Sequence, residues 1–541
     1  MKIFLSQLNP IVGDIFGNTQ KVLKTLQKAK KERVDIVLFP EMILCGYPTD
    51  DLLLFPEFIS EIEKQTKKIA SATIGLFVVV GTVRKEENKL FNTTAIFCDG
   101  KFLGYKDKTL LPSYEVFNES RYFKEGKKQK IWEFKGKRIG VFVSEDVWEH
   151  AKILKNTYYE RDPVEEMKQL KPDIVLISSA SPYFLRKKEI REKVYQRTTQ
   201  TLECPVFVVN QVGGHEQLIF DGYSLYLNEK GEICQEAKGF EEDDMIIDLK
   251  NSFLSCPISF DYLHDLYNAL VLGVKDYFYK NGFKKAVLGI SGGIDSALSC
   301  CITVDALGKE NVLALNMPTR FSLLEGMEDA KVLSENLGIK MIDMPIDHVY
   351  QIFLDLLSPI FSKKCFGTAE ENIQARIRAM ILMAVSNKLG HVVLSTGNKS
   401  EMAMGYCTIY GDMCGGFGVL IDVPKTYVYR LAKYLNKQEK RIPENIIRKE
   451  PSAELKQKQK DKDDLPEYSV VDKVLKNYVE EHMSKEEIVK KEKLNQNLVE
   501  ELIHKIHLAE FKRRQGPIGV RVTKQSFGRG RFFPIVQKWV D

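Results

Sequence analysis

The sequence lacks the features that mark several large classes of protein. Its 541 residues contain no apolar run of about eighteen residues, so no membrane-spanning helix is expected. The apolar stretch at the N-terminus is short and partly polar, and no small-residue cleavage site follows it, so no signal peptide is expected either. The ten cysteines include no C-x-x-C pair. This argues against zinc and against a disulfide scaffold, and it favours a reducing, cytoplasmic environment.

An excess of charge of one sign is also missing. The 79 Lys and Arg residues against 74 Asp and Glu residues leave a net charge of +5, which gives no support to a general nucleic-acid binder. The 44% hydrophobic residues and only 19 prolines are typical of globular domains and exclude disorder, collagen and coiled coil for the whole chain. At roughly 150 residues per domain, two or three large α/β domains fit the length.

The first 250 residues alternate short apolar runs with helical patterns. A helix is expected behind Asn18, its predicted N-cap, because Val22 and Leu26 recur at helical spacing. Strands that are apolar throughout are buried on both faces, which indicates sheets covered by helices. The expected strands are 2–8, 35–39, 76–83, 93–97, 138–143, 173–178 and 205–210.

A second β/α series follows a break in the pattern at 249–258, which predicts domains at 1–250 and 259–541. Strands at 285–290, 311–318 and 391–396, separated by helices, predict a doubly wound parallel sheet. The helix expected at 371–390 carries one apolar stripe, formed by Ile373, Ile377, Met380, Ile381 and Ala384. The charged stretch at 448–464 is a solvated loop by composition alone.

The sharpest motif is LGISGGIDSAL at 288–298, where a strand ends, two glycines follow and a helix begins. Such a turn presents backbone N–H groups and hydroxyls at a positive helix N-terminus, which suits phosphate. Glycine allows the phosphate oxygens to approach closely. The G-x-x-x-x-G-K-[ST] loop is absent. The predicted ATP contacts in this turn are Ser291, Gly292, Gly293, Ile294, Asp295 and Ser296.

This segment resembles the ATP pyrophosphatases, and the sequence downstream of it resembles the NAD synthetase family. NMPTRFS (316–322), STGNKSE (395–401), YGDMCGGFGVLIDVPKTYVYRLA (410–432) and PSAELKQKQKDKDDLPEYSVVD (451–472) carry the likeness. The resemblance implies an adenine nucleotide alpha hydrolase-like fold, Mg²⁺ with ATP held by Asp295 and Glu401, and Thr396 as an ATP contact. It also implies that the charged stretch orders over the dinucleotide, and it assigns deamido-NAD to Asn372, Arg376, Glu401, Asp412 and Lys425.

The N-terminal half resembles the nitrilase superfamily, an α-β-β-α sandwich, and in particular the glutaminase domain fused to bacterial NAD synthetases. LFPEMILCGYPTDDLLL (38–54), KTLLPSYEVFNESRYF (108–123) and RIGVFVSEDVWEH (138–150) carry this likeness. The resemblance implies Glu41 as general base, Lys108 as the oxyanion-stabilising group and position 144 as the nucleophile. Glutamine contacts are expected from Tyr114, Glu145, Ser181 and Lys187. GGHEQLIFDG (213–222) departs from the family pattern, so contacts of its side chains are not carried over.

Together the resemblances imply a two-domain enzyme that releases ammonia from glutamine and uses ATP to amidate deamido-NAD through an acyl-adenylate. They also imply a homo-oligomer in which synthetase domains pair as dimers. Two other ATP-pyrophosphatase amidotransferases fit less well. GMP synthetase normally brings a G-x-C-x-G glutaminase, which is absent, and asparagine synthetase needs cysteine after the initiator, where this chain has lysine. A non-catalytic nucleotide-binding scaffold is expected to lose Asp295 or Glu401, and both are present.

The nucleophile position departs from the family, because Ser144 stands where cysteine is expected. The chemistry needs a thiolate, and a serine hydroxyl is a far weaker acid. Three explanations are open: an engineered inactivation that leaves glutamine intact, a natural loss that leaves an ammonia-dependent synthetase, or a serine that acts slowly. We favour the first, because Glu41, Lys108 and the surrounding motif are complete and decay is expected to erode them too.

Overall fold

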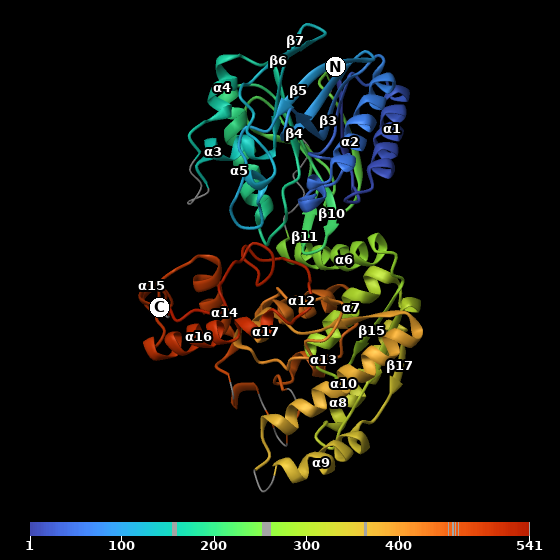
Figure 1. The fold of residues 1–541 in the computed structure, drawn as a ribbon, viewed down its shortest axis with the longest axis vertical. Coiled ribbons are helices and arrows are strands. Elements are labelled where there is room, and N and C mark those ends of the chain that lie inside the picture. The colour runs from blue at the N-terminus through green and yellow to red at the C-terminus, as the bar shows by residue number, and fades with distance from the viewer. Residues whose placement is uncertain are drawn as a thin grey trace. The chain divides into compact units, whose positions relative to one another are not determined.

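The computed structural model describes residues 1–153, 159–250, 261–361, 365–452, 454–456, 459, 461–463 and 465–539. The chain divides into two compact units, Met1–Asp265 and Leu266–Asp541 (Figure 1). The predicted boundary at 249–258 lies mostly outside the described residues, so its position stays a prediction. None of the helices in the described ranges is both long and apolar enough to cross a membrane.

Two six-stranded sheets form the centre of the N-terminal unit, counted over the described residues. Their strand orders are β14-β1-β2-β3-β4-β5 and β13-β12-β9-β8-β7-β6, and β10 and β11 form a separate hairpin. The strands are β1 Lys2–Gln7, β2 Ile36–Leu38, β3 Phe77–Glu86, β4 Lys89–Cys98, β5 Lys101–Asp107, β6 Ile131–Phe134, β7 Lys137–Val143, β8 Ile174–Ser179, β9 Val206–Asn210, β10 Val212–His215, β11 Leu218–Asp221, β12 Leu225–Leu227, β13 Ile233–Glu236 and β14 Asp243–Asp248.

Alternation along the strands builds a four-layer sandwich. In β1, Ile3 and Leu5 pack between the two sheets, while Phe4 packs beneath the outer helices. In β8, Leu176 faces the other sheet and Ile177 faces its own helices. The covering helices are α1 Ile15–Lys31 and α2 Pro56–Ile69 on one side, and α3 Trp148–Ala151, α4 Pro163–Gln169 and α5 Lys187–Leu202 on the other. The predicted α-β-β-α sandwich is confirmed.

Helix α1 begins earlier than the sequence analysis predicted. Its N-cap is Asp14, whose carboxylate accepts a hydrogen bond from the backbone N–H of Gly17 at 2.9 Å. Asn18 lies inside the helix, where it is buried and donates to the carbonyl of Ile11 at 2.8 Å. The N-cap prediction was wrong, because the amide of Asn18 serves the preceding loop instead of the helix end.

The C-terminal unit is built on a parallel sheet of order β17-β16-β15-β18-β19, as far as the described residues show. The chain lays down β15, β16 and β17 in one direction and then returns to the other side of β15, so a crevice opens at the carboxyl ends of β15 and β18. The predicted doubly wound sheet is confirmed. Its strands are β15 Lys285–Gly289, β16 Val312–Asn316, β17 Lys340–Asp343, β18 His391–Ser395 and β19 Phe417–Gly418.

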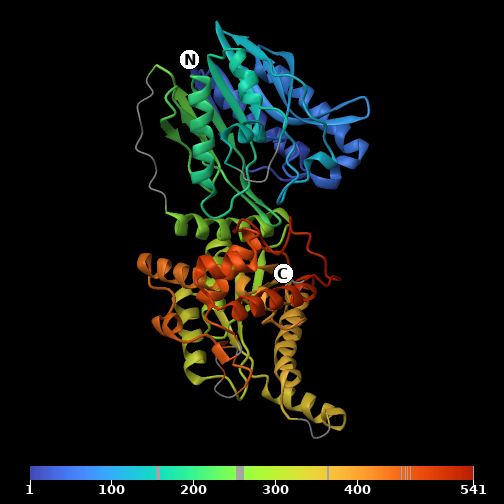
Figure 2. The ribbon, with the colours of Figure 1, turned by 90° about the vertical axis from the view of Figure 1, so that its left-hand side faces the viewer.

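Most of the remaining elements are helices of the C-terminal unit. In Figures 1 and 2, α9 and the adjoining end of α10 project from the rest of this unit. The helices are α6 Tyr262–Lys280, α7 Ile294–Leu307, α8 Leu324–Leu337, α9 Asp347–Phe361, α10 Thr368–Leu389, α11 Lys399–Met404, α12 Lys425–Gln438, α13 Glu444–Arg448, α14 Tyr468–Leu475, α15 Lys485–Glu492, α16 Gln496–Leu508 and α17 Glu510–Arg513.

The predicted apolar stripe of α10 is only partly buried. Ile377 is 2% exposed and packs on the sheet, with Ile373 and Ile381 partly buried beside it. Met380 is 55% exposed and Met383 is 38% exposed. Met380 lies on a second apolar arc that the helix turns away from the sheet, and Ala384 of the predicted stripe is also exposed.

Candidate active sites

Three predicted catalytic residues of the N-terminal unit follow the ends of strands. Glu41 comes shortly after β2, Lys108 directly after β5 and Ser144 directly after β7. All three are nearly buried, at 1%, 2% and 7% exposure. Gly81 makes room for the Glu41 loop, since a Cβ there would lie 2.2 Å from the carbonyl oxygen of Pro40. A larger residue at 81 would displace the loop.

Glu41 and Lys108 belong to one buried network of charge. Glu41 Oε1 accepts hydrogen bonds from Lys108 Nζ at 2.8 Å and from Asn92 Nδ2 at 2.7 Å, and Oε2 accepts from the backbone N–H of Ala180 at 3.0 Å. Lys108 Nζ also donates to Glu119 Oε1 at 2.6 Å. Burial disfavours the ammonium form of Lys108, but the carboxylates of Glu119 and Glu41 outweigh burial and raise its pKa above the ordinary value. The lysine is thus a fixed positive charge.

Ser144 stands at a strained turn between β7 and a 3₁₀ helix, with a φ of +40°. This left-handed conformation is rare for a residue other than glycine and turns the side chain away from the path of the strand. Its hydroxyl lies 3.3 Å from that of Ser179, at the end of β8. The geometry suits a nucleophile at the end of a strand.

The carboxylate of Asp146 ties this turn to the lysine loop. Its oxygens accept hydrogen bonds from the backbone N–H groups of Thr109 and Leu110, at 2.7 and 3.1 Å, and of Val143, at 3.3 Å. Lys106 Nζ pairs with it at 2.9 Å. The backbone beside Ser144 and the backbone beside Lys108 are therefore held by one side chain.

Two of the predicted glutamine contacts, Tyr114 and Glu145, contact each other, and the other two, Ser181 and Lys187, have partners of their own. Glu145 accepts hydrogen bonds from Tyr114 at 2.9 Å and from Tyr159 at 3.1 Å, and burial raises the pKa of Glu145 to about 7 even though Lys108 opposes the shift. The backbone N–H of Ser181 donates to Asn210 Oδ1 at 2.8 Å. The ammonium of Lys187 lies 4.0 Å from the ring centroid of Trp148, a cation–π contact.

Three residues that assemble this site were not predicted from the sequence: Asn92, Glu119 and Asp146. Glu119 lies inside the quoted lysine motif, and Asp146 lies inside the quoted nucleophile motif. Their types and positions were visible, but only the fold shows that Glu119 closes the charge network and that Asp146 joins two loops.

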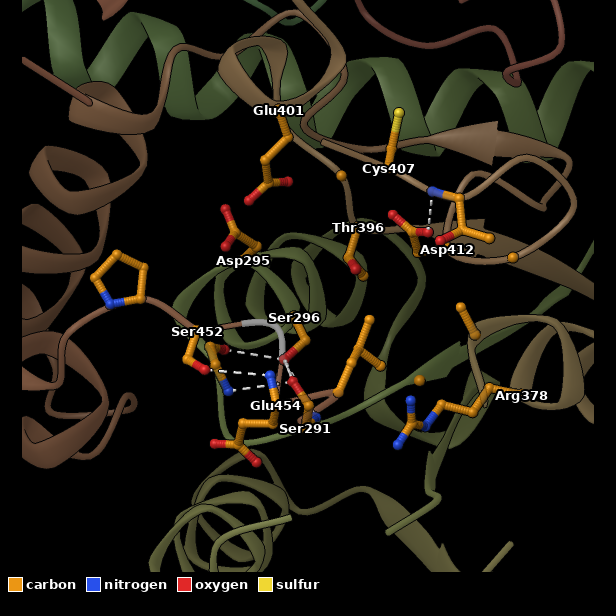
Figure 3. A pocket seen from close by; sticks show the side chains of 18 of the residues that line it. Ser291, Asp295, Ser296, Arg378, Thr396, Glu401, Cys407, Asp412, Ser452 and Glu454 are labelled. Carbon is orange, nitrogen blue, oxygen red and sulfur yellow. Dashed lines mark hydrogen bonds between the residues drawn. The ribbon is translucent and has the colours of Figure 1, made fainter. Parts of the chain in front are cut away.

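The second site is a cavity of about 790 Å³ at the carboxyl ends of β15 and β18, where the strand order reverses (Figure 3). All the predicted ATP contacts line it, Ser291 to Ser296 and Thr396. Among the predicted deamido-NAD contacts, Asn372, Glu401, Asp412 and Lys425 line it and Arg376 does not.

The phosphate-loop geometry follows from its glycines. Gly292 has a φ of +72°, and a Cβ there would lie 2.1 Å from the carbonyl oxygen of Gly326. Gly293 precedes the first residue of α7, so the backbone N–H groups of that helix end face the cavity. Ser296 Oγ donates to the carbonyl of Gly293 at 2.9 Å and lies 3.4 Å from Ser291 Oγ. The loop is preformed for phosphate.

The two predicted metal-binding carboxylates converge on a lysine. Lys425 Nζ donates to Asp295 Oδ2 and to Glu401 Oε1, the latter at 3.0 Å, and Asn398 Nδ2 donates to Asp295 Oδ1 at 2.9 Å. Figure 3 shows that the carboxylates of Asp295 and Glu401 point toward each other. Burial raises the pKa of Glu401 to about 7, against the pull of Lys425.

The donor set of this pair fits Mg²⁺. Mg²⁺ takes one or two carboxylates and completes its shell with water and substrate phosphates. Asp295 and Glu401 supply the carboxylates, and the phosphate loop runs directly into Asp295. The described part of the chain groups no three His, Cys, Asp or Glu side chains into an all-protein metal site.

Helix α10 explains why one predicted arginine lies outside the cavity. Its cavity-lining arc is centred on Ala375, with Asn372 at one edge and Arg378 at the other. Arg376 lies beyond the Asn372 edge, is exposed, and donates to the carbonyl of Ile409 at 3.2 Å. Arg378 donates to the carbonyl of Met317 at 3.0 Å, and its guanidinium points into the cavity (Figure 3). Burial lowers the pKa of Arg378 to about 10.

Parts of the charged stretch at 448–464 line the same cavity. Lys449 Nζ pairs with Glu454 Oε1 at 2.6 Å, and Gln374 Nε2 donates to the carbonyl of Leu455 at 2.9 Å. Positions 453, 457, 458, 460 and 464 lie outside the described residues. Most of the described positions therefore line the cavity, where composition alone predicts a solvated loop, whereas Arg448 and Lys462 are exposed.

Comparison with known proteins assigns each unit to a family. Residues 2–253 match the carbon-nitrogen hydrolase family, and residues 266–516 match the NAD synthase family. The fold and sites thus define a hydrolase of carbon–nitrogen bonds joined to a nucleotide-dependent ligase. The chain is 40% identical to the glutamine-dependent NAD(+) synthetase of Synechocystis sp., over 99% of this chain and 98% of that protein. It belongs to the family of glutamine-dependent NAD(+) synthetases.

Further relatives also match this chain over nearly its whole length. The glutamine-dependent NAD(+) synthetase of Aquifex aeolicus is 39% identical, and the match covers 100% of both chains. Among solved structures, the glutamine-dependent NAD+ synthetase of Acinetobacter baumannii in complex with adenosine diphosphate is 38% identical, with a TM-score of 0.79, over 99% of this chain and 98% of that one. The enzyme from Cytophaga hutchinsonii, at 19% identity and a TM-score of 0.86, shows the shared fold.

Proposed function

We propose that the chain amidates deamido-NAD to NAD, with ATP as the energy source and with glutamine or ammonia as the nitrogen source. The observation that carries this proposal is the cavity at the carboxyl ends of β15 and β18, where a preformed phosphate loop meets two carboxylates. In the N-terminal unit, the buried residues Glu41, Lys108 and Ser144 support the other part of the proposal, which is the release of ammonia from glutamine. Relatives that match the whole chain carry the name of this activity.

In the N-terminal unit, Glu41 takes the proton of the nucleophile at position 144, which attacks the amide carbon of glutamine. The fixed charge of Lys108 then stabilises the oxyanion of the tetrahedral intermediate, in a site where burial strengthens electrostatic interactions. Glu41 returns the proton to the amide nitrogen, ammonia leaves, and water then hydrolyses the acyl-enzyme. A serine hydroxyl at 144 slows the first of these steps, because it gives up its proton far less readily than a thiol.

In the C-terminal unit, residues 291–296 and Thr396 hold the phosphates of ATP, and Asp295 and Glu401 would hold Mg²⁺. Bound there, Mg²⁺ would neutralise phosphate charge and favour pyrophosphate as a leaving group. Asn372 and Asp412 orient the nicotinate end of deamido-NAD, so that its carboxylate meets the α-phosphate. Adenylation gives the carboxylate a leaving group, AMP, that ammonia displaces.

We propose that a second copy of the chain packs against the side of α10 that faces away from the sheet. Arg376 shares this arc with Met380 and Met383, which are 55% and 38% exposed. Exposed apolar side chains continue along α9, at Ile352, Leu356 and Ile360. Pairing of two synthetase units over α9 and α10 would bury these residues and bring Arg376 into a covered site.

One assay tests the proposed activity. NAD is quantified in reactions that contain deamido-NAD, MgATP and either glutamine or ammonium chloride. We expect AMP and pyrophosphate in equal amounts with NAD, and far faster synthesis from ammonium than from glutamine. Failure to form NAD from ammonium would overturn the proposal for the C-terminal unit. Equal rates from the two sources would overturn the proposed defect at Ser144.

A further inference from the structure

Lys425 occupies an unusual position for a lysine. It is the first residue of α12 and is 2% exposed. A positive charge at a helix N-terminus is disfavoured by the helix dipole, and burial of an ammonium adds a further cost. The two carboxylates that it contacts offset both costs. Local helix stability therefore does not explain a lysine at this position, whereas its contacts with Asp295 and Glu401 do.

The ammonium and a metal ion require the same oxygen atoms. Lys425 Nζ contacts Asp295 Oδ2 and Glu401 Oε1, at 3.0 Å from the second. Mg²⁺ binds carboxylate oxygens at about 2.0–2.1 Å. A cation that joins both carboxylates at that distance occupies the space between them, so Nζ has to leave it. Lys425 lines the nucleotide cavity, so its ammonium can turn toward the space that the phosphate loop surrounds.

Asn398 keeps the pair in place while the cation changes. Its Nδ2 donates to Asp295 Oδ1, and its backbone N–H donates to Glu401 Oε2 at 3.2 Å. Each carboxylate thus has one oxygen bound by Asn398 and the other bound by Lys425. Loss of the ammonium contact leaves both carboxylates oriented and frees one oxygen on each.

We propose that Lys425 is an exchangeable cation, which neutralises Asp295 and Glu401 in the nucleotide-free chain and gives way to Mg²⁺ when MgATP binds. The inference rests on the proposed metal site. Free Mg²⁺ has to displace the ammonium into a cavity without phosphate, whereas Mg²⁺ that arrives with ATP provides phosphate oxygens for the displaced ammonium. The exchange therefore makes metal binding depend on the nucleotide.

The test uses Mn²⁺ as the probe, titrated into the full-length chain and followed by the electron paramagnetic resonance signal of the free ion. Three variants accompany the parent chain: Lys425→Met, Lys425→Arg and Lys449→Met. The last is a matched control, since it removes one lysine charge from the same cavity wall at a residue paired with Glu454. Affinity for a non-hydrolysable ATP analogue is measured in parallel.

Without nucleotide, Lys425→Met is expected to bind Mn²⁺ at least about tenfold more tightly than the parent. Lys425→Arg and Lys449→Met are expected to stay near the parent. For the analogue with Mn²⁺, Lys425→Met is expected to bind several-fold more weakly, because the phosphates lose the ammonium. Opposite changes in the two affinities distinguish exchange from a structural role, which would weaken both.

The inference would be overturned if the parent and Lys425→Met bound Mn²⁺ with equal affinity, or if Lys425→Met bound both Mn²⁺ and the analogue more weakly. Either result would leave the proposed metal site standing. Failure of every form to bind Mn²⁺, even with the analogue, would overturn the metal site as well. If Lys425→Met does not fold, the parent chain alone decides. The inference requires at least a tenfold gain in Mn²⁺ affinity when the analogue is present, and equal affinities with and without it contradict exchange.

Discussion

At the glutamine site the reactive groups are held by fixed partners and nearly excluded from solvent, whereas at the nucleotide site charged groups line an open cavity. Glu41 and Lys108 hold each other within a closed network. Lys425 pairs with two carboxylates that line a space of about 790 Å³. A small amide needs a charge arrangement that is complete before it binds. Two large anionic substrates need cations that can change partners when they arrive.

The largest expected effect lies at the closed site. Ser144→Cys should raise glutamine-dependent NAD synthesis by about three to five orders of magnitude, because a thiolate restores covalent catalysis in a network that is otherwise complete. The rate with ammonium chloride should stay the same, since the C-terminal unit takes ammonia from any source. Both rates are measured for the parent and the variant.

The matched control is the double variant Ser144→Cys with Lys108→Met, which restores the thiol but removes the oxyanion charge. It should remain slow with glutamine. A parent chain that already uses glutamine as fast as Ser144→Cys would contradict the prediction and make serine a competent nucleophile.

At the open site, loss of one carboxylate should stop synthesis from both nitrogen sources. Asp295→Ala removes one of the two proposed metal-binding carboxylates, for an expected loss of about 10³-fold in AMP release. Asp355→Ala, at an exposed position of α9, is the control and should match the parent. AMP release from Asp295→Ala at the parental rate would refute the assignment.

Substitution of Arg376 and of Arg378 should have different effects on substrate binding, because the two arginines lie on different sides of α10. Arg378→Ala should raise KM for ATP or for deamido-NAD, the two proposed substrates of the cavity, by about tenfold or more. The reason is that a guanidinium that binds an anion contributes about 1.5–3 kcal/mol to the binding free energy. Arg376→Ala should raise KM for deamido-NAD with little change in Tm. Kinetics at saturating and limiting substrate separate KM from kcat.

This difference can be tested further by breaking the proposed dimer. Met380→Lys should yield monomers by light scattering, and in that background the effect of Arg376→Ala should vanish while that of Arg378→Ala persists. If Arg376→Ala lowers Tm strongly without changing KM, the arginine is a structural surface residue.

The smallest expected effect is a pH dependence of stability at Glu145. Its pKa in the folded chain, about 7, is above the ordinary value of 4.5, so folding favours the protonated form. Its contribution is therefore most favourable below pH 4.5, declines between pH 4.5 and 7, and is constant above pH 7. Glu145→Gln keeps an acceptor for Tyr114 without the charge and should be more stable than the parent at pH 8, by about 3 kcal/mol at most.

Thermal unfolding of the two forms from pH 5 to pH 8 measures this difference, which should be small at pH 5. Glu203→Gln, at an exposed position, is the control and should follow the parent at every pH. A constant difference between Glu145→Gln and the parent across this range would show that the carboxyl does not titrate there.

The sequence predicted the sheets because their strands are long apolar runs. β1, β8 and β15 are buried on both faces, and each lies within two residues of its predicted range. Some polar or very short strands were not predicted. β14 reads DDMIID and β19 has two residues, so neither carries a periodic signal, and only pairing with a neighbour defines them.

The site residues divide in the same way. The phosphate loop was predictable because glycine at 292 is required by local backbone geometry, which a short motif records. The contacts of Lys425 and Asp146 were not, because each joins segments far apart in the chain. Arg378 shares a motif with Arg376, and only the orientation of α10 decides which of the two faces the cavity.

The role of Asp146 has a practical consequence. Because its carboxylate fixes the lysine loop to the nucleophile turn, the side chain at 144 is not needed to join these two segments. The reactive atom is a replaceable part of an otherwise rigid receptor. A chain with serine at this position can therefore be used as a glutamine-capture protein, in which ligand residence time, not turnover, becomes the measured signal.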